Sequence, residues 1–156
     1  MIFICVLLLI IAAESIIKTN RETYGKMGKR QLILGGKLYL TKYHNYGVFL
    51  NMGEKRPWLV KSVSFALTLI CTTLFVLTLG NKGGLLLKTA LAILLGGAYS
   101  NTYDRMVRGY VVDYFGFHVK NKKIRNVVYN ISDFCIVIGA LLAVLSENKK
   151  VGHSGE

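Results

Sequence analysis

The sequence predicts an all-α membrane protein with four transmembrane helices and a small β-structure between helices 1 and 2. Three observations support this fold class. The 156-residue chain is 53% hydrophobic and contains one proline, and its mean hydropathy is +0.43. Four apolar stretches follow one another along the chain, and a polar connection of about forty residues separates the first two. This composition fits neither an ordinary soluble domain nor a disordered chain.

The predicted spans cover about residues 1–17, 58–79, 85–100 and 127–145. Each approaches the roughly 20 residues that a helix needs to cross the hydrocarbon core. Helix is expected because the backbone inside a bilayer must satisfy its own hydrogen bonds. The first stretch has no basic residue before its apolar run, so we expect a retained helix rather than a signal peptide. We therefore expect residues 1–156 to form a single membrane domain.

The connection after the first span contains the predicted β-structure, over about residues 19–57. Gly35 and Gly36 are followed by the strand-like run 37–41, and a bare loop of this length is unusual in a compact protein. The next connection, 80–84, is a short turn. The third connection, about 101–126, is polar.

The formal net charge of +12 is carried mainly by the first and third connections. In a membrane protein such basic segments are expected to contact anionic lipid headgroups, so membrane lipids are expected partners and nucleic acid is not. The positive-inside rule alone would place both connections in the cytoplasm. Cys5, Cys71 and Cys135 lie in apolar stretches, where we expect packing rather than disulfides or metal binding.

The acidic residues point to chemistry. Asp113 lies in the third connection, and Asp133 lies about six residues into the fourth span, on the order of 9 Å below its mouth. A connection folded back over the helix ends would bring the two together, and they would then share a proton in the manner of aspartic proteases. The alternative is that Asp113 is a turn residue and Asp133 a buried hydrogen-bonding group.

Polar neighbours favour the functional interpretation. Asn130 is placed at i,i+3 from Asp133, and Asn101 and Arg105 are four residues apart, as are Asp104 and Arg108. Glu14 and Lys18 also have this spacing, and we expect a structural pair in which Lys18 extends to the surface. The run 96–98, Gly-Gly-Ala, is expected at a close helix contact. Trp58, Tyr110 and Tyr114 suit the aromatic belt of the interface, and His44 is expected to be a surface histidine.

Two motifs then resemble one known family. The stretch from Gly96 through Asp104-Arg105 to Asp113-Tyr114 resembles the GGAxGNxxDRxxxGxVxDF signature of signal peptidase II, the bacterial lipoprotein signal peptidase. The segment Tyr129–Asp133 resembles its FNxAD motif, and Asn45-Tyr46-Gly47 resembles its NxG motif. The resemblance implies an aspartic endopeptidase of the bacterial cytoplasmic membrane. Such an enzyme needs no cofactor and cuts prolipoproteins, its lipid-modified substrates, just before the diacylglyceryl-bearing cysteine.

Site residues follow from the resemblance by position. Asp113 and Asp133 would be the catalytic pair. The supporting or substrate-contacting shell would contain Asn45, Asn101, Asp104, Arg105 and Asn130, with Glu14 and Lys18 at the positions of the first motif. No metal is implied. The resemblance also places the first and third connections outside the cytoplasm, against the charge count, and we expect the active site near the extracytoplasmic face.

The chain departs from the family pattern at several positions. Glu14 replaces Asp, Ser100 replaces Gly, Ser132 replaces Ala, and the run 48–50 replaces Ala-Ala-Phe. These changes bear on substrate preference and rate. Two other functions stay open on the residues themselves. One is a non-catalytic relative that binds lipidated peptides or lipid headgroups, and the other is a proton-coupled transporter that uses Asp133 and Glu14.

Overall fold

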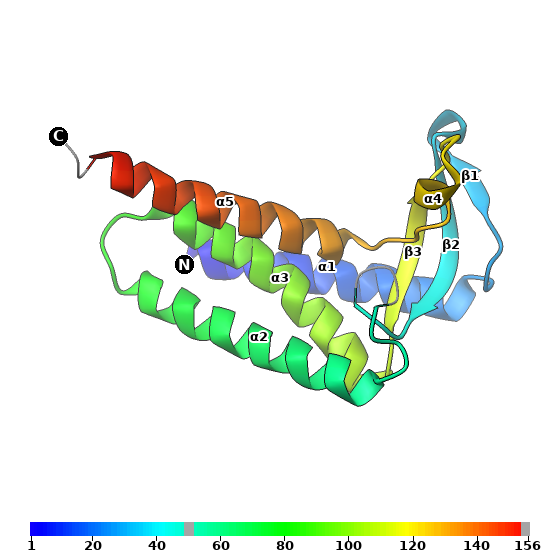
Figure 1. Cartoon of the computed structure of the whole chain (residues 1–156), viewed down its shortest axis with the longest axis horizontal. Helices are drawn as coiled ribbons and strands as arrows, with labels where there is room; N and C mark the ends of the chain where they lie inside the picture. The colour runs from blue at the N-terminus through cyan, green and yellow to red at the C-terminus, as the bar shows by residue number, and fades with distance from the viewer. Residues whose placement is uncertain (49–51, 154–156) are drawn as a thin grey trace.

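Four long helices and a small sheet make up the computed structural model of the protein (Figure 1). The structure describes residues 1–48 and 52–153. Each long helix has 23 residues, or roughly 35 Å at about 1.5 Å per residue, against a hydrocarbon core about 30 Å thick. The long helices are α1 (Ile2–Tyr24), α2 (Pro57–Leu79), α3 (Leu85–Val107) and α5 (Ile131–His153).

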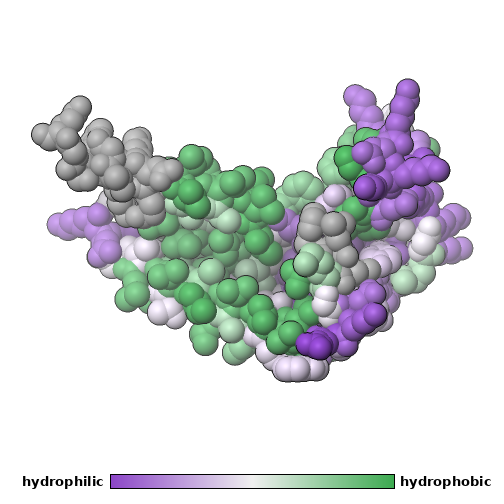
Figure 2. Space-filling model, in the orientation of Figure 1, coloured by the Kyte–Doolittle hydropathy of each residue, from purple (hydrophilic) through white to green (hydrophobic). Residues whose placement is uncertain are grey.

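The surface of the bundle is apolar. Figure 2 shows a largely hydrophobic surface over the helices, with most hydrophilic residues at the sheet end and a smaller group at the opposite end. Leu9, Ile70 and Leu141 are more than half exposed, and monomeric soluble proteins rarely expose apolar patches of this extent. Within the described residues, α1 and α2 are long and apolar enough to cross a membrane, and α5 has a shorter apolar part over Ile131–Ser146.

Helix α3 is central, because it packs against α1, α2 and α5. Glycines allow these close approaches. A β-carbon at Gly96 would meet Ile10 of α1 at 2.8 Å, and one at Gly139 of α5 would meet the Leu94 backbone nitrogen at 2.6 Å. Gly97 likewise faces Ser132 of α5. The expected close contact at 96–98 is therefore confirmed, as small residues permit between membrane helices.

The sheet contains three antiparallel strands in the order β1-β2-β3. Figure 1 shows it standing across one end of the bundle. Strands β1 (Gln31–Ile33) and β2 (Leu38–Asn45) are joined by the 3₁₀ turn η1 (Leu34–Gly36) and come from the first connection, as predicted. Strand β3 (Val111–Phe117) comes from the third connection, followed by the short helix α4 (Lys122–Arg125). That third strand was not predicted, although its valines and aromatic residues suit a strand.

The helices also differ from the predicted spans at four ends. Helix α1 continues to Tyr24 and α3 to Val107, beyond the apolar stretches, and the added turns contain Lys18 and Asp104, which are buried and lie 3.2 Å apart. Helix α5 begins at Ile131 rather than near Val127 and ends at His153 rather than near Leu145. Before it, Tyr129 pairs with Phe115 at the edge of β3, so this segment is extended.

Candidate active site

The two predicted catalytic carboxylates meet at the junction of β3 and α5. Asn130 contacts both: its side-chain Nδ2 donates to Asp113 Oδ1 at 2.6 Å, and its backbone N–H donates to Asp133 Oδ2 at 3.1 Å. Asp113 is 1% exposed and Asn130 is fully buried. A single residue thus bridges a strand carboxylate and a helix carboxylate.

Asn130 also explains where α5 begins. Its side-chain oxygen accepts the backbone N–H of Asp133 at 3.1 Å, while Asp133 accepts the backbone N–H of Asn130. This reciprocal pair is a capping box. Asp133 therefore lies in the first turn of α5 and not six residues into a span, so the predicted depth was wrong. Its carboxylate sits where the helix dipole favours negative charge.

Asn45 at the end of β2 holds Asp113 from the other side. Its Nδ2 donates to Asp113 Oδ2 at 3.0 Å, and its Oδ1 accepts the Gly47 N–H at 3.0 Å. A β-bulge between Leu40 and Tyr43 shifts the register where β2 passes β3, so that Tyr43 pairs with Asp113. Bulges re-aim side chains in this way and are frequent beside active sites.

Asn101 on α3 connects Asp133 to a buried lysine. Its Nδ2 donates to Asp133 Oδ1 at 2.9 Å, and its Oδ1 accepts from Lys18 Nζ at 2.7 Å. The lysine ammonium can only donate. The amide is therefore oriented with its NH₂ group toward Asp133.

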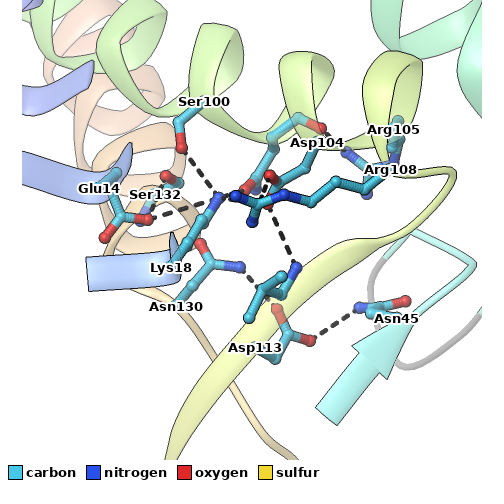
Figure 3. A network of polar contacts seen from close by, with 12 residues as sticks. Glu14, Lys18, Asn45, Ser100, Asp104, Arg105, Arg108, Asp113, Asn130 and Ser132 are labelled. Atoms are coloured by element: carbon cyan, nitrogen blue, oxygen red, sulfur yellow. Dashed lines mark hydrogen bonds and ion pairs between the residues drawn. The ribbon is translucent and has the colours of Figure 1, made fainter. Parts of the chain in front are cut away.

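Lys18 is the centre of the charged network (Figure 3). Its ammonium lies 3.2 Å from Asp104 Oδ2, 3.6 Å from Glu14 Oε2 and 2.9 Å from Ser100 Oγ. The expectation that Lys18 extends to the surface was wrong, because the side chain is 1% exposed. Acceptors from two helices surround it, and this arrangement offsets the cost of burying an ammonium.

Asp104 ties the network to the residue before Asp113. Its Oδ2 accepts the backbone N–H of Val112 at 3.2 Å. Its Oδ1 lies 3.2 Å from Arg108 Nη1, the predicted i,i+4 pair. Arg108 also donates to Thr19 Oγ1 at 3.0 Å, so the end of α3 is fixed to α1 and to β3.

Arg105 lies beside a pocket of about 370 Å³ between α2, α3 and α5. Its Nη2 donates to the Gly47 carbonyl at 3.0 Å and its Nη1 to the Asn101 carbonyl at 3.4 Å. Its buried Nε has no hydrogen-bond partner among the described residues. The pocket is mainly apolar, with Asn45, Asn101, Arg105 and Asp133 in its lining. Polar groups converging on an apolar pocket are typical of a ligand site.

The environment of Asp113 favours its neutral form. Burial, followed by the nearby Asp133 carboxylate, raises the pKa of Asp113 from 3.8 to about 7, against the opposing hydrogen bonds from Asn130 and Asn45. Asp113 therefore holds a proton into the neutral range. The two carboxylates differ in surroundings, as acid and base partners do in catalytic pairs.

Two hydroxyl groups of the site, those of Tyr114 and Ser132, were not predicted from the sequence. Tyr114 was expected in the interface belt, but it is 4% exposed and donates to Glu14 Oε1 at 2.5 Å. Ser132, noted only as a departure, donates from Oγ to Glu14 Oε2 at 2.6 Å. Two observations pointed to these contacts: a buried Glu14 carboxylate needs donors, and both residues adjoin the predicted pair.

The structure thus joins every predicted site residue into one connected polar network: Glu14, Lys18, Asn45, Asn101, Asp104, Arg105, Asp113, Asn130 and Asp133. His44 stands apart from this network, because it pairs with Glu22 at 3.0 Å and stacks on Tyr110. Of the run 48–50, Phe49 and Leu50 lie outside the described residues.

Comparison with known proteins places the chain among one group of relatives. Residues 2–148 match the family described as Signal peptidase (SPase) II. The chain is 36% identical to the lipoprotein signal peptidase of Alteromonas mediterranea over 74% of this chain and 64% of that protein. It is 30% identical to that of Bacillus subtilis over 91% of this chain and 90% of that protein.

The fold has a solved counterpart. A bacterial membrane enzyme structure matches with a TM-score of 0.82 and 21% identity, covering 99% of this chain and 92% of that one. At this identity the match supports the fold alone. The family match covers nearly the whole chain, so the protein belongs to the signal peptidase II family and is a peptidase.

Proposed function

We propose that this protein is an aspartic peptidase that removes the signal peptides of prolipoproteins, cutting before the diacylglyceryl-modified cysteine. Asp113 and Asp133 are its catalytic pair. The observation that carries the proposal is the double contact of Asn130, which holds Asp113 at 2.6 Å and Asp133 at 3.1 Å. Two otherwise unrelated carboxylates are brought into one buried site at the junction of sheet and bundle.

The surroundings of the two aspartates support different roles for them. Asp113, whose pKa is raised to about 7 by burial and by the Asp133 charge, supplies the proton. Asp133 accepts hydrogen bonds from Asn101 and from the Asn130 backbone and lies at a helix N-terminus, where negative charge is favoured. Asp133 is therefore the base that takes a proton from water.

The reaction is then direct hydrolysis. Water loses a proton to Asp133 and its oxygen bonds to the scissile carbonyl carbon, while Asp113 donates its proton to the carbonyl oxygen. Collapse of the tetrahedral diol breaks the C–N bond: the departing nitrogen takes up the proton held by Asp133, and one diol hydroxyl returns a proton to Asp113. One water is consumed, a carboxylic acid and an amine form, and no covalent enzyme intermediate arises.

The pocket suits a substrate held in lipid. Its apolar lining, including Leu67, Leu94 and Val137 from three helices, can receive an apolar chain, while Asp133 and Arg105 face the same space. The positive charge of Arg105, which lines the pocket, favours a substrate carbonyl there. Asp113 connects to this pocket through Asn45, which both lines the pocket and donates to Asp113.

We further propose that all four long helices span the membrane as one domain, with the sheet lying at the extracytoplasmic face. Among the described helices, α1 and α2 are apolar over a full span, whereas α3 contains Asn101, Asp104 and Arg105 and α5 contains Asp133. These polar groups point into the network and the pocket, as intramembrane ionisable groups do when they serve a function.

The test is cleavage of a diacylglyceryl-modified prolipoprotein peptide by purified protein in detergent. Wild type should cleave, and Asp113→Asn and Asp133→Asn should each lower kcat by about 100-fold or more, the range expected for a missing general acid or base. Glu54→Gln is the matched control, because it also removes one carboxylate, at an exposed position, and it should keep wild-type activity.

The outcomes separate the alternatives. Binding of the lipidated peptide without cleavage, by well-folded wild type and across several cleavage-site sequences, would identify a non-catalytic lipopeptide-binding relative. Cleavage that survives both substitutions would remove the aspartates from the mechanism.

A further inference from the structure

Glu14 reaches the two residues that flank the catalytic pair. Its carboxylate is 1% exposed. Oε1 accepts the hydroxyl of Tyr114, the residue after Asp113, at 2.5 Å. Oε2 accepts both the backbone N–H and the hydroxyl of Ser132, the residue before Asp133, at 3.1 and 2.6 Å. One carboxylate of α1 thus holds strand β3 and helix α5 together beside both aspartates.

Tyr114 adds a second link between these elements. Its hydroxyl oxygen accepts the backbone N–H of Ile131, the first residue of α5, at 3.1 Å. Burial and the adjacent Glu14 charge raise the pKa of Tyr114, so the hydroxyl keeps its proton and donates at neutral pH. The phenol therefore bridges α1, β3 and the start of α5.

Lys18 also supports Asp133, through Asn101. It lies 3.6 Å from Glu14 Oε2 and donates to Asn101, which in turn donates to Asp133 Oδ1. Figure 3 shows Glu14, Ser132, Lys18 and Ser100 gathered on one side of Asp113. The aspartates are thus held through neighbouring residues as well as through direct hydrogen bonds.

We propose that Glu14, Tyr114 and Ser132 form a clamp that sets the separation and orientation of Asp113 and Asp133. The three are positioning residues, because they touch the neighbours of the pair and not the reacting atoms. The inference rests on the proposed function, since it names what holds the proposed catalytic pair in place. It assigns a catalytic consequence to two hydroxyls, one on β3 and one on α5.

The departures from the quoted signature support treating the clamp as one unit. The signature has Phe and Ala where this chain has Tyr114 and Ser132, and Asp where it has Glu14. Each added hydroxyl donates to the longer acid. The Glu14 side chain is one methylene longer than that of Asp, and its carboxylate accepts both hydroxyl donors. The three differences therefore act together.

Loss of a clamp hydroxyl should affect rate more than binding. A small displacement of catalytic groups is costly to the chemical step, whereas the pocket that receives the apolar chain is lined by other residues. We expect Ser132→Ala and Tyr114→Phe each to lower kcat by roughly 10-fold, with KM within about 2-fold of wild type.

The chain offers matched controls for both changes. Ser146→Ala also removes a buried α5 hydroxyl, which bonds only the Ala143 carbonyl among the described residues, and Tyr99→Phe removes a phenolic hydroxyl that bonds Thr72 of α2. Both should keep wild-type kcat. Ser132→Cys preserves volume but has a weaker donor, so its kcat should fall between those of wild type and Ser132→Ala.

A further measurement tests whether the residues are coupled. In a Glu14→Gln background, the additional Ser132→Ala and Tyr114→Phe changes should cost much less than they do in wild type, because their common acceptor is already altered. Full additivity of the three effects would overturn the clamp.

The readouts distinguish failure of the clamp from failure of the proposed function. If Asp113→Asn abolishes cleavage but Ser132→Ala and Tyr114→Phe keep wild-type kcat, the clamp is wrong and the function stands. If wild type does not cleave, the clamp can still be tested by infrared titration of the Asp113 carboxyl. The carboxyl band of Asp113 is the one that is missing from the Asp113→Asn protein. Tyr114→Phe should shift that titration and Tyr99→Phe should not; equal titrations in both would reject the clamp.

Discussion

At the scale of single residues, the proposed chemistry depends on which carboxylate carries the proton. Asp113 is enclosed by β3, Asn45 and Asn130 and is 1% exposed, and its pKa is raised to about 7 by burial and by Asp133. With Asp133 ionised as the base, the proton of the pair is on Asp113, and it is lost as the pH rises through about 7.

This assignment predicts a pH dependence. If protonated Asp113 is the acid, kcat/KM should be level just below pH 7 and should fall above it, approaching about tenfold per pH unit, because the active protonation state is depleted. The measurement is kcat/KM from pH 5.5 to 9 with a peptide whose own groups do not titrate in that range. A profile that rises through pH 7 would instead make ionised Asp113 the base and exchange the two roles.

Lys18 supports a second residue-level prediction, about stability. Removing its ammonium leaves Glu14 and Asp104 buried with a lost counter-charge, and breaking such a buried pair costs about 3–5 kcal/mol. Lys18→Met should therefore lower Tm markedly in detergent. Lys82→Met, at an exposed position in the turn before α3, is the control and should leave Tm near that of wild type. Equal Tm values for the two variants would mean that Lys18 does not stabilise the fold.

At the scale of elements, hydropathy predicted the helices better than their ends. The apolar stretches located α1, α2, α3 and α5, but α1 and α3 continue through polar turns that hold Lys18 and Asp104. Hydropathy alone would assign such residues to the start of a loop. Their burial depends on partners from distant segments, which no local window contains.

The sheet shows the same limit. A small β-structure was expected in the first connection, around the strand-like run 37–41, whereas the strand over residues 111–117, which contains Asp113, was not expected. The motif resemblance placed Asp113 and Asp133 in one site without giving the strand that positions the first. Tyr114 was misassigned because a tyrosine beside a span suits the membrane interface, and its partner Glu14 lies 100 residues away.

Helix packing gives a prediction at this scale. A β-carbon at Gly139 of α5 would approach the Leu94 nitrogen at 2.6 Å and the Ala90 carbonyl at 2.7 Å, so the α3–α5 backbones would have to separate. Gly139→Ala should cost about 1–3 kcal/mol, the range for overpacking, and lower Tm. Gly80→Ala is the control, because a β-carbon there meets nothing within 4 Å. A Gly139→Ala protein as stable as the control would contradict the close α3–α5 contact.

At the scale of the whole molecule, polar and apolar residues lie in different regions. The sheet end carries the polar network and many exposed basic residues, while the helices present an apolar surface (Figure 2). If all four long helices span the membrane as proposed, the sheet and the site lie toward one membrane face. The positive-inside rule would place that face in the cytoplasm, whereas the family resemblance places it outside, so charge and motif predict opposite orientations.

The orientation can be measured directly by thiol labelling in intact cells. In a background with Cys5, Cys71 and Cys135 changed to alanine, Lys122→Cys places a thiol on α4 at the sheet end, and Lys82→Cys places one in the turn between α2 and α3 at the opposite end. Both positions are exposed, so access depends on the membrane and not on burial. A membrane-impermeant maleimide should label the Lys122→Cys protein in whole cells and the Lys82→Cys protein only after lysis. The reverse pattern would make the basic connections cytoplasmic, and a prolipoprotein anchored in the outer leaflet could not then reach Asp113 and Asp133.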